Sequence, residues 1–226
     1  MNQRTKGTFI TLEGLDGCGK STQARLLADE LRALGHAVLL TREPGGTSLG
    51  EKLREILLNP QSKVSPDAEL FLYLADRAQH VAEVVFPALK AGKIVISERF
   101  ADSTLAYQGA GRGLPRRRLE SLNRIATAGL KPHLTIVLDL SPAAAQARKA
   151  TLPLPADRFE RLERAFHQRL AQEYRKLAAE EPARIHLIKA SGSIEQVHRR
   201  VMQALAKAEL LRPTRSRATP PQRRRR

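Results

Sequence analysis

The chain has 226 residues, 42% of them hydrophobic and 4% aromatic, so it can form one large domain with an aliphatic core. The single cysteine, Cys18, cannot form an internal disulfide. No apolar run reaches the ~20 residues of a membrane-spanning helix, and the first residues lack a secretory pattern. These features exclude a disulfide scaffold and a membrane-spanning protein, and we expect a cytoplasmic location.

The formal net charge of +16 suggests a nucleic-acid partner, but much of the charge lies at one end. Residues 212–226 hold seven arginines and no acidic residue, which leaves +9 for the rest of the chain. We therefore expect one domain over 1–211 and a disordered basic tail over 212–226. The tail has no aromatic side chains on which bases could stack, so we expect no requirement for nucleic acid.

Short β-rich runs alternate with longer amphipathic ones along the chain. Helical patterns follow the first strand, ending at Gly35, and recur at 48–58, 66–91, 115–128, 159–180 and 194–210. Strands are expected at 8–12, 37–40, 94–96, 135–138 and 185–188. This alternation predicts an α/β fold of three layers, in which helices cover both faces of a parallel five-stranded sheet. Residues 150–157 contain two prolines without periodicity and are expected to form a loop, either a lid or a plain connection.

The strongest motif follows the first expected strand. Residues 14–21 read Gly-Leu-Asp-Gly-Cys-Gly-Lys-Ser, which matches the P-loop pattern G-x-x-x-x-G-K-[ST] between a strand and an amphipathic helix. The glycines let backbone N–H groups surround phosphate oxygens, Lys20 reaches the outer phosphates and Ser21 is placed to bind Mg²⁺. The motif predicts a nucleoside triphosphate site and leaves ATPases, GTPases and kinases open.

Two polar segments follow the second and third expected strands. Residues 41–47 read Thr-Arg-Glu-Pro-Gly-Gly-Thr, and residues 98–109 read Glu-Arg-Phe-Ala-Asp-Ser-Thr-Leu-Ala-Tyr-Gln-Gly. Because ligands bind beyond the carboxyl ends of parallel strands, both segments are expected beside the P-loop. Their arginines, hydroxyls, amide and phenol suit a phosphorylated nucleoside better than a water nucleophile.

On these motifs the sequence resembles the thymidylate kinase family. The segments that carry the resemblance are 13–22, 42–47, 75–79, 98–109, 139–142 and 157–160. The resemblance implies phosphoryl transfer from ATP to dTMP, which gives dTDP and ADP for dTTP synthesis, with Mg²⁺ as the cofactor. It also implies a homodimer packed through helices, for which the helix at 66–91 is the candidate.

The resemblance also assigns residues to the two nucleotide sites. The ATP site would comprise Gly14, Leu15, Asp16, Gly17, Cys18, Gly19, Lys20, Ser21 and Thr22. The dTMP site would comprise Asp16, Arg42, Glu43, Pro44, Arg54, Tyr73, Arg77, Arg99, Thr104, Tyr107 and Gln108.

At the sugar and phosphate end of dTMP, Asp16 would hold the 3′-hydroxyl and Arg99 would grip the phosphate. Arg42 and Arg54 would lie near the same phosphate, and Tyr107 would crowd C2′ of the sugar. Plainer alternatives stay open, since Asp16 could be a helix N-cap or turn residue and Arg54 could lie on a solvated helix face.

At the base end, Tyr73 would stack on the pyrimidine ring, and Arg77, one turn later, would bind the thymine carbonyl. Thr104 and Gln108 would read the pyrimidine edge. The less favoured alternative is that Tyr73 and Arg77 form an ordinary surface or core pair of the helix without a ligand.

The catalytic groups that the resemblance implies are Lys20, Arg99, Arg148 and Arg158. Members of the family carry a catalytic arginine either just after the P-loop acid, where this chain has Gly17, or in a lid. We therefore expect a lid near 148–158 to deliver the charge, with Lys149 as a further contributor. Glu98 stands where aspartate is commoner and would support Mg²⁺ through water, together with Ser21.

Two other functions remain alternatives. A kinase for another nucleoside monophosphate would differ in how Tyr73, Arg77, Thr104 and Gln108 read the base. A nucleic-acid-binding or regulatory P-loop protein would use the basic tail, and would leave the acceptor motifs without a purpose.

Overall fold

Residues 6–151, 158–159 and 162–210 are described by a computed structural model of the chain. The expected tail at 212–226 and most of the expected lid lie outside these residues.

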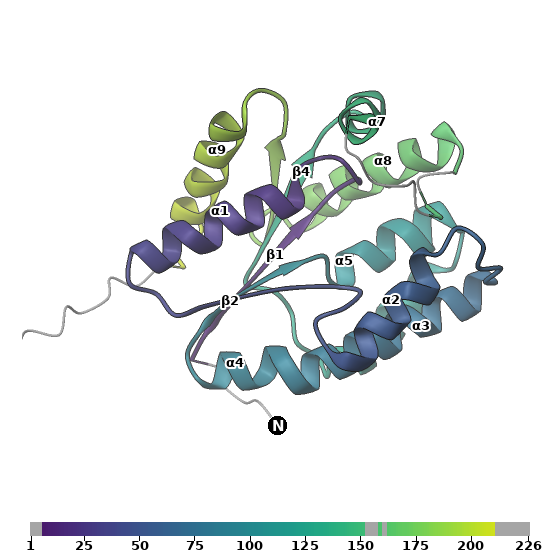
Figure 1. The fold of residues 1–226 in the computed structure, drawn as a ribbon, viewed down its shortest axis with the longest axis horizontal. Coiled ribbons are helices and arrows are strands. Elements are labelled where there is room, and N and C mark those ends of the chain that lie inside the picture. The colour runs from purple at the N-terminus through teal and green to yellow at the C-terminus, as the bar shows by residue number, and fades with distance from the viewer. Residues whose placement is uncertain (1–5, 152–157, 160–161, 211–226) are drawn as a thin grey trace, which may run out of the picture.

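A sheet of five parallel strands forms the centre of the molecule, as expected (Figure 1). In chain order the strands are β1 (Thr8–Glu13), β2 (Val38–Arg42), β3 (Ile94–Glu98), β4 (Leu134–Asp139) and β5 (Ile185–Lys189). Their order in the sheet is β2-β3-β1-β4-β5, and every pair is parallel. The strands β2 and β3 lie on one side of β1, and after β3 the chain crosses to β4 and β5 on the other side. Because the chain changes direction here, a crevice opens at the carboxyl end of β1. The P-loop begins directly after β1 and therefore lies at this crevice.

Helices cover both faces of the sheet, which confirms the three-layer α/β architecture. On one face α1 (Lys20–Ala33) packs beside α9 (Ile194–Lys207). On the other face α4 (Phe86–Lys90) contacts β3, and α8 (Arg164–Glu180) contacts β4 and β5. Successive side chains of β1 point to opposite faces of the sheet. Ile10 packs in the large core cluster that includes α1, and Phe9 packs in the cluster that includes α4.

The helices beside the crevice are α2 (Ser48–Leu58), α3 (Pro66–His80) and α6 (Arg116–Ala126). The helical run expected at 66–91 is present as α3, a π-helical segment η1 (Val81–Val85) and α4. The wider turn lies just before Pro87, whose missing N–H interrupts the helical hydrogen-bond ladder. α3 packs against both α2 and α6, so it forms one wall of the candidate site.

Four local features differ from the sequence-based expectations. Residues 101–111, to which the sequence assigned no structure, form α5 (Ala101–Thr104) and a π-helical segment η2 (Leu105–Gly111). The helix α7 (Pro142–Ala150) was likewise not assigned, and α8 begins at Arg164 rather than at residue 159. The first helix, expected to end at Gly35, has Leu34 as its C-cap residue, and Leu34 exposes 53% of its surface. None of the described helices combines the length and the apolar character that crossing a membrane requires.

Candidate active site

The loop between β1 and α1 is shaped to bind an anion. Gly14, Gly17 and Gly19 all have positive φ, and a Cβ at Gly14 would come within 2.7 Å of the Leu138 carbonyl oxygen. α1 begins without a side-chain cap or an acidic residue in its first turn, so its N-terminal N–H groups stay available. Lys20 Nζ donates to the carbonyl oxygens of Gly14 (3.1 Å) and Leu15 (2.8 Å), which keeps the ammonium inside the loop.

Ser21 and Glu98 bring two oxygen ligands together at the start of α1. Ser21 Oγ donates to Glu98 Oε2 at 2.6 Å, and Glu98 is the last residue of β3. Oxygen donors of this kind suit Mg²⁺, so the pair fits a hard divalent cation. Among the described residues no group of three or more His, Cys, Asp or Glu side chains could hold a metal ion.

A pocket of about 550 Å³, its open mouth included, lies beside the P-loop between α2, α3, α5 and η2. All of the dTMP-site residues named from the sequence line it except Arg42. Arg42 is half exposed and pairs with Glu51 at 3.1 Å instead. Leu58, Ser103 and Phe159 complete the lining. Ser103 and Phe159 lie inside motifs that the sequence already singled out, whereas nothing local marks Leu58.

Arg99 links the P-loop to this pocket. Its Nη2 donates to Asp16 Oδ1 (2.6 Å) and to the Tyr107 hydroxyl (2.8 Å), and its guanidinium lies over the Tyr107 ring. Burial opposes ionisation of Asp16, but the charges of Arg99 and Lys20 hold the pKa of this carboxyl well below its usual range. Asp16 does not cap α1, since Gly19 is the N-cap residue, so the capping alternative is wrong.

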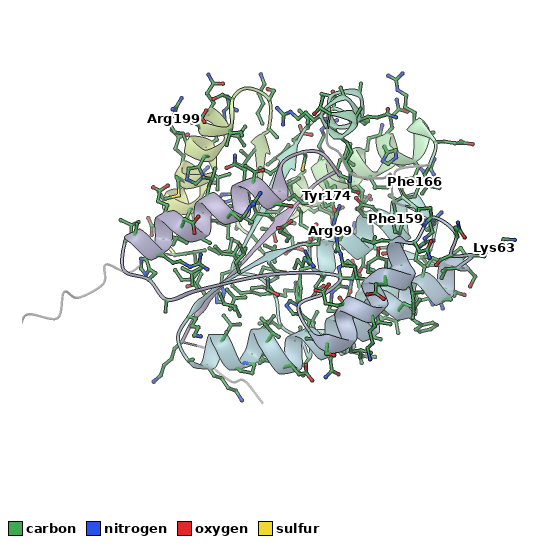
Figure 2. All side chains as sticks on the ribbon, viewed as in Figure 1. Lys63, Arg99, Phe159, Phe166, Tyr174 and Arg199 are labelled. Carbon is green, nitrogen blue, oxygen red and sulfur yellow. The ribbon has the colours of Figure 1, made fainter. Side chains whose placement is uncertain are left out.

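A buried carboxylate below Arg99 fixes the start of α5. Glu13 accepts hydrogen bonds from the Phe100 N–H (2.8 Å), Ser103 Oγ (2.6 Å) and the Tyr174 hydroxyl (3.0 Å). Burial, together with the charge of Asp102, raises the pKa of Glu13. In Figure 2 Arg99 and Tyr174 lie side by side, and Arg99 Nη1 is 3.5 Å from the Tyr174 hydroxyl. Glu13 and Tyr174 thus hold the segment that carries Arg99 against the end of β1.

At the far end of the pocket the guanidinium of Arg77 is 2% exposed. Arg77 donates through Nε to Glu43 (2.8 Å), through Nη1 to Thr104 and Asn123 (2.7 Å each) and through Nη2 to the Phe100 carbonyl (2.9 Å). A guanidinium has five N–H groups, so these bonds leave one N–H on Nη2 uncommitted. Arg77 is also one of the residues that line the pocket.

Aromatic rings form the walls between these two ends. The Phe159 ring lies 5.5 Å from that of Tyr107 and 6.3 Å from that of Tyr73. Thr104 and Gln108 project from α5 and η2, one turn apart, and both are almost fully buried. A flat ring with polar edges would fit between these aromatic and polar groups.

Comparison with known proteins now identifies the family. The thymidylate kinase family model matches residues 12–201. A thymidylate kinase of Synechococcus sp. strain JA-2-3B'a(2-13) is 53% identical over 193 residues, which cover 85% of this chain and 91% of the relative. A thymidylate kinase of Pelotomaculum thermopropionicum is 49% identical over 200 residues, 88% of this chain and 93% of the relative. The chain belongs to the thymidylate kinase family.

A solved structure agrees with this membership. The crystal structure of thymidylate kinase from Ehrlichia chaffeensis superposes with a TM-score of 0.72 at 33% identity. The alignment covers 88% of this chain and 98% of that chain. The likeness thus extends over the whole arrangement of strands and helices that forms the pocket.

Two arginines that the thymidylate kinase resemblance implied as catalytic are bound to groups outside the P-loop. Arg148 Nη2 donates to the Gly192 carbonyl oxygen (3.4 Å) at the far end of α7. Arg158 binds Glu69 through Nη1 (2.7 Å) and the Leu57 carbonyl through Nε (3.0 Å). Lys149 lies beside the P-loop, because a Cβ on Gly17 would stand 3.4 Å from Lys149 Cβ. The charge of Lys149 also helps to lower the pKa of Asp16.

Proposed function

We propose that this protein is a thymidylate kinase that transfers the γ-phosphoryl group of ATP to dTMP, giving dTDP and ADP for the synthesis of dTTP. One observation carries the proposal: the pocket lined by the acceptor residues opens directly beside the P-loop, with Asp16 and Arg99 at the junction. Two nucleotides bound in these sites would meet at their phosphates.

The donor site consists of the P-loop N–H groups and Lys20. The uncapped start of α1 and the glycine backbone surround the β- and γ-phosphates, and Lys20 leaves its loop carbonyls to bind them. The acceptor phosphate oxygen attacks the γ-phosphorus in line, without a covalent intermediate on the protein. Catalysis therefore rests on positioning and on positive charge around the transferred group.

Arg99 grips the acceptor phosphate in this proposal. Its guanidinium is held by Asp16, Tyr107 and Ser103, so it is already oriented before a ligand arrives. Asp16 keeps its negative charge at neutral pH and holds the 3′-hydroxyl of the sugar. Lys149, whose Cβ would lie 3.4 Å from a Cβ on Gly17 of the P-loop, supplies further positive charge.

The base of dTMP lies between Tyr73 and Phe159 in this proposal, at the inner end of the pocket. The uncommitted N–H of Arg77 donates to the O4 carbonyl of thymine, and Thr104 and Gln108 face the N3 edge. Tyr107 stands against the sugar and disfavours a 2′-hydroxyl.

Mg²⁺ is the proposed cofactor, held by Ser21 directly and by Glu98 through water. When bound, it would neutralise phosphate charge. Although Glu98 is one methylene longer than the commoner aspartate, its Oε2 lies 2.6 Å from Ser21 Oγ, so both oxygens can serve one metal site.

A homodimer in the cytoplasm is also proposed. Phe71 on α3 and Ile125 on α6 expose 52% and 77% of their surfaces, although α3 and α6 pack together. Large apolar side chains exposed on neighbouring helices favour contact with a second copy of the chain.

A coupled assay of ADP release tests the activity. At fixed Mg·ATP we expect turnover with dTMP to exceed turnover with dUMP and dCMP.

Lys20→Ala should lower kcat by about 10²-fold or more, because it removes the charge nearest the transferred phosphoryl group. Its circular dichroism should stay that of the wild type, and the exposed Lys90→Ala serves as the matched control. A preference for another base would favour the sister kinase, and retained turnover in Lys20→Ala would refute the P-loop mechanism.

A further inference from the structure

A buried carboxylate on α3, outside every motif that the sequence singled out, lies behind the base end of the pocket. Glu69 has no exposed surface. Its Oε1 accepts from Gln108 Nε2 at 2.8 Å, and its Oε2 accepts from Arg112 Nη2 (2.9 Å) and Arg158 Nη1 (2.7 Å). Two guanidinium groups donate to this one buried carboxylate, and each compensates for the solvation that the carboxylate lost on burial.

The charge on Glu69 fixes which way the amide of Gln108 points. An ionised carboxylate can accept hydrogen bonds but cannot donate them, so Gln108 must present its NH₂ group to Glu69. The carbonyl oxygen Oε1 of Gln108 is then at the opposite end of the amide. No described residue donates to that oxygen, and Gln108 lines the pocket.

We propose that Glu69 is a positioning residue that sets base specificity by locking the Gln108 carboxamide with its carbonyl oxygen toward the ligand. The inference rests on the proposed function, because it concerns the base that the acceptor pocket selects. Without Glu69 the amide could rotate by 180° and offer either a donor or an acceptor.

The locked amide distinguishes two classes of pyrimidine. Thymine and uracil carry an N3–H, which donates to the Gln108 carbonyl oxygen. Cytosine carries a lone pair on N3 that repels this oxygen, and its 4-amino group would meet the uncommitted N–H of Arg77. Unpaired buried polar groups are costly, so Glu69 contributes to the rejection of cytosine nucleotides.

The same carboxylate also holds part of the pocket wall. Arg158, bound to Glu69, stacks on the ring of Phe159 at 4.6 Å from its centroid, and Phe159 lines the pocket. A general loosening of this wall would weaken binding of all pyrimidines alike. A change in the ratio between bases therefore separates the amide lock from a purely structural role.

The test compares kcat/KM for dTMP and dCMP in the full-length protein and in Glu69→Gln. A carboxamide at position 69 can accept or donate, so Gln108 regains both orientations. We expect the dTMP:dCMP ratio to fall about tenfold, through a higher KM for dTMP with little change in the KM for ATP. The matched control is Asp67→Asn, which makes the same chemical change at an exposed position of α3 and should leave the ratio unchanged.

Two further variants keep the test decisive. Glu69→Asp retains the buried charge but is one methylene too short for Gln108, so the ratio should fall even if Glu69→Gln does not fold. In a Gln108→Met background, Glu69→Asp should change the ratio no further. An unchanged ratio in folded Glu69 variants, or an equal further fall in the Gln108→Met background, overturns the inference. A wild type without preference for dTMP instead overturns the proposed function.

Discussion

The buried carboxyl groups around the pocket differ in how completely they are paired. Glu69 accepts from three side chains, whereas Asp76 on α3 accepts from the Gly45 N–H (2.9 Å) through Oδ1 only. The second oxygen of Asp76 is buried and has no hydrogen-bond partner within the described part of the chain. Burial and the charge of Glu43 raise the pKa of Asp76 to about 7. Asp76 is therefore a titrating group beneath the loop that carries Glu43 and Pro44.

This raised pKa predicts that stability declines as the pH rises. Between pH 4 and 7 the folded protein keeps a proton on Asp76 that the unfolded chain has already released, so the free energy of unfolding falls over this range. Asp76→Asn is neutral at every pH and can still accept from the Gly45 N–H. In urea denaturation we expect the variant to lose less stability than the wild type between pH 5 and pH 8. Parallel pH profiles for the two proteins would contradict this, and the exposed Asp67→Asn should follow the wild type.

At the scale of elements, the sequence predicts those helices and strands that are defined by local patterns, such as apolar runs and helix caps. The strands at β3 and β4 are short apolar runs, and α2 starts at a Thr47 cap, so pattern and caps suffice. Residues 101–111 contain Ser, Thr and Gly, which favour helix poorly. Contacts distant in sequence hold this segment, such as Ser103 with Glu13 and Asp102 with Arg184. Such pairings cannot be read from a local window.

The contact between α7 and the P-loop also depends on the tertiary structure. Gly17 has a φ of 82°, and a Cβ there would come within 2.3 Å of the Ala145 carbonyl oxygen on α7. α7 therefore packs directly on the loop that binds phosphates. Lys149, one turn after Ala145, lies on the same face.

Gly17→Ala should consequently destabilise the protein and impair ATP binding. The new methyl group both strains the backbone and pushes α7 away, at a cost of about 2–3 kcal/mol. For a protein of this size we expect the thermal midpoint to fall by about 5–10 °C and the KM for ATP to rise. Gly113→Ala is the matched control, because its φ of 79° is similar but nothing lies within 4 Å of the new Cβ. Equal shifts in the two variants would show that α7 does not rest on the loop.

At the scale of the whole molecule, the sequence predicts those site residues that lie in motifs directly after the strands. Asp16, Glu43 and Arg99 come just after β1, β2 and β3, and parallel strands bring their carboxyl ends to one edge of the sheet. The positions of Arg148 and Arg158 could not be predicted, because they depend on Gly192 and Glu69, which lie far away in the sequence. Glu69 itself is an acid in the first turn of an amphipathic helix, a pattern typical of a solvated helix start.

The proposed homodimer gives a prediction for the molecule as a whole. Phe71→Glu places a charge among the exposed apolar side chains of α3 and α6, and burying that charge in an interface is costly. In sedimentation velocity at micromolar concentration we expect the wild type to be a dimer and Phe71→Glu a monomer. Ile194→Glu is the control: Ile194 is 54% exposed, but it starts α9, on the side of the molecule away from α3 (Figure 1). A Phe71→Glu protein that sediments like the wild type at every concentration would exclude this face, and dissociation of Ile194→Glu alone would move the interface to α9.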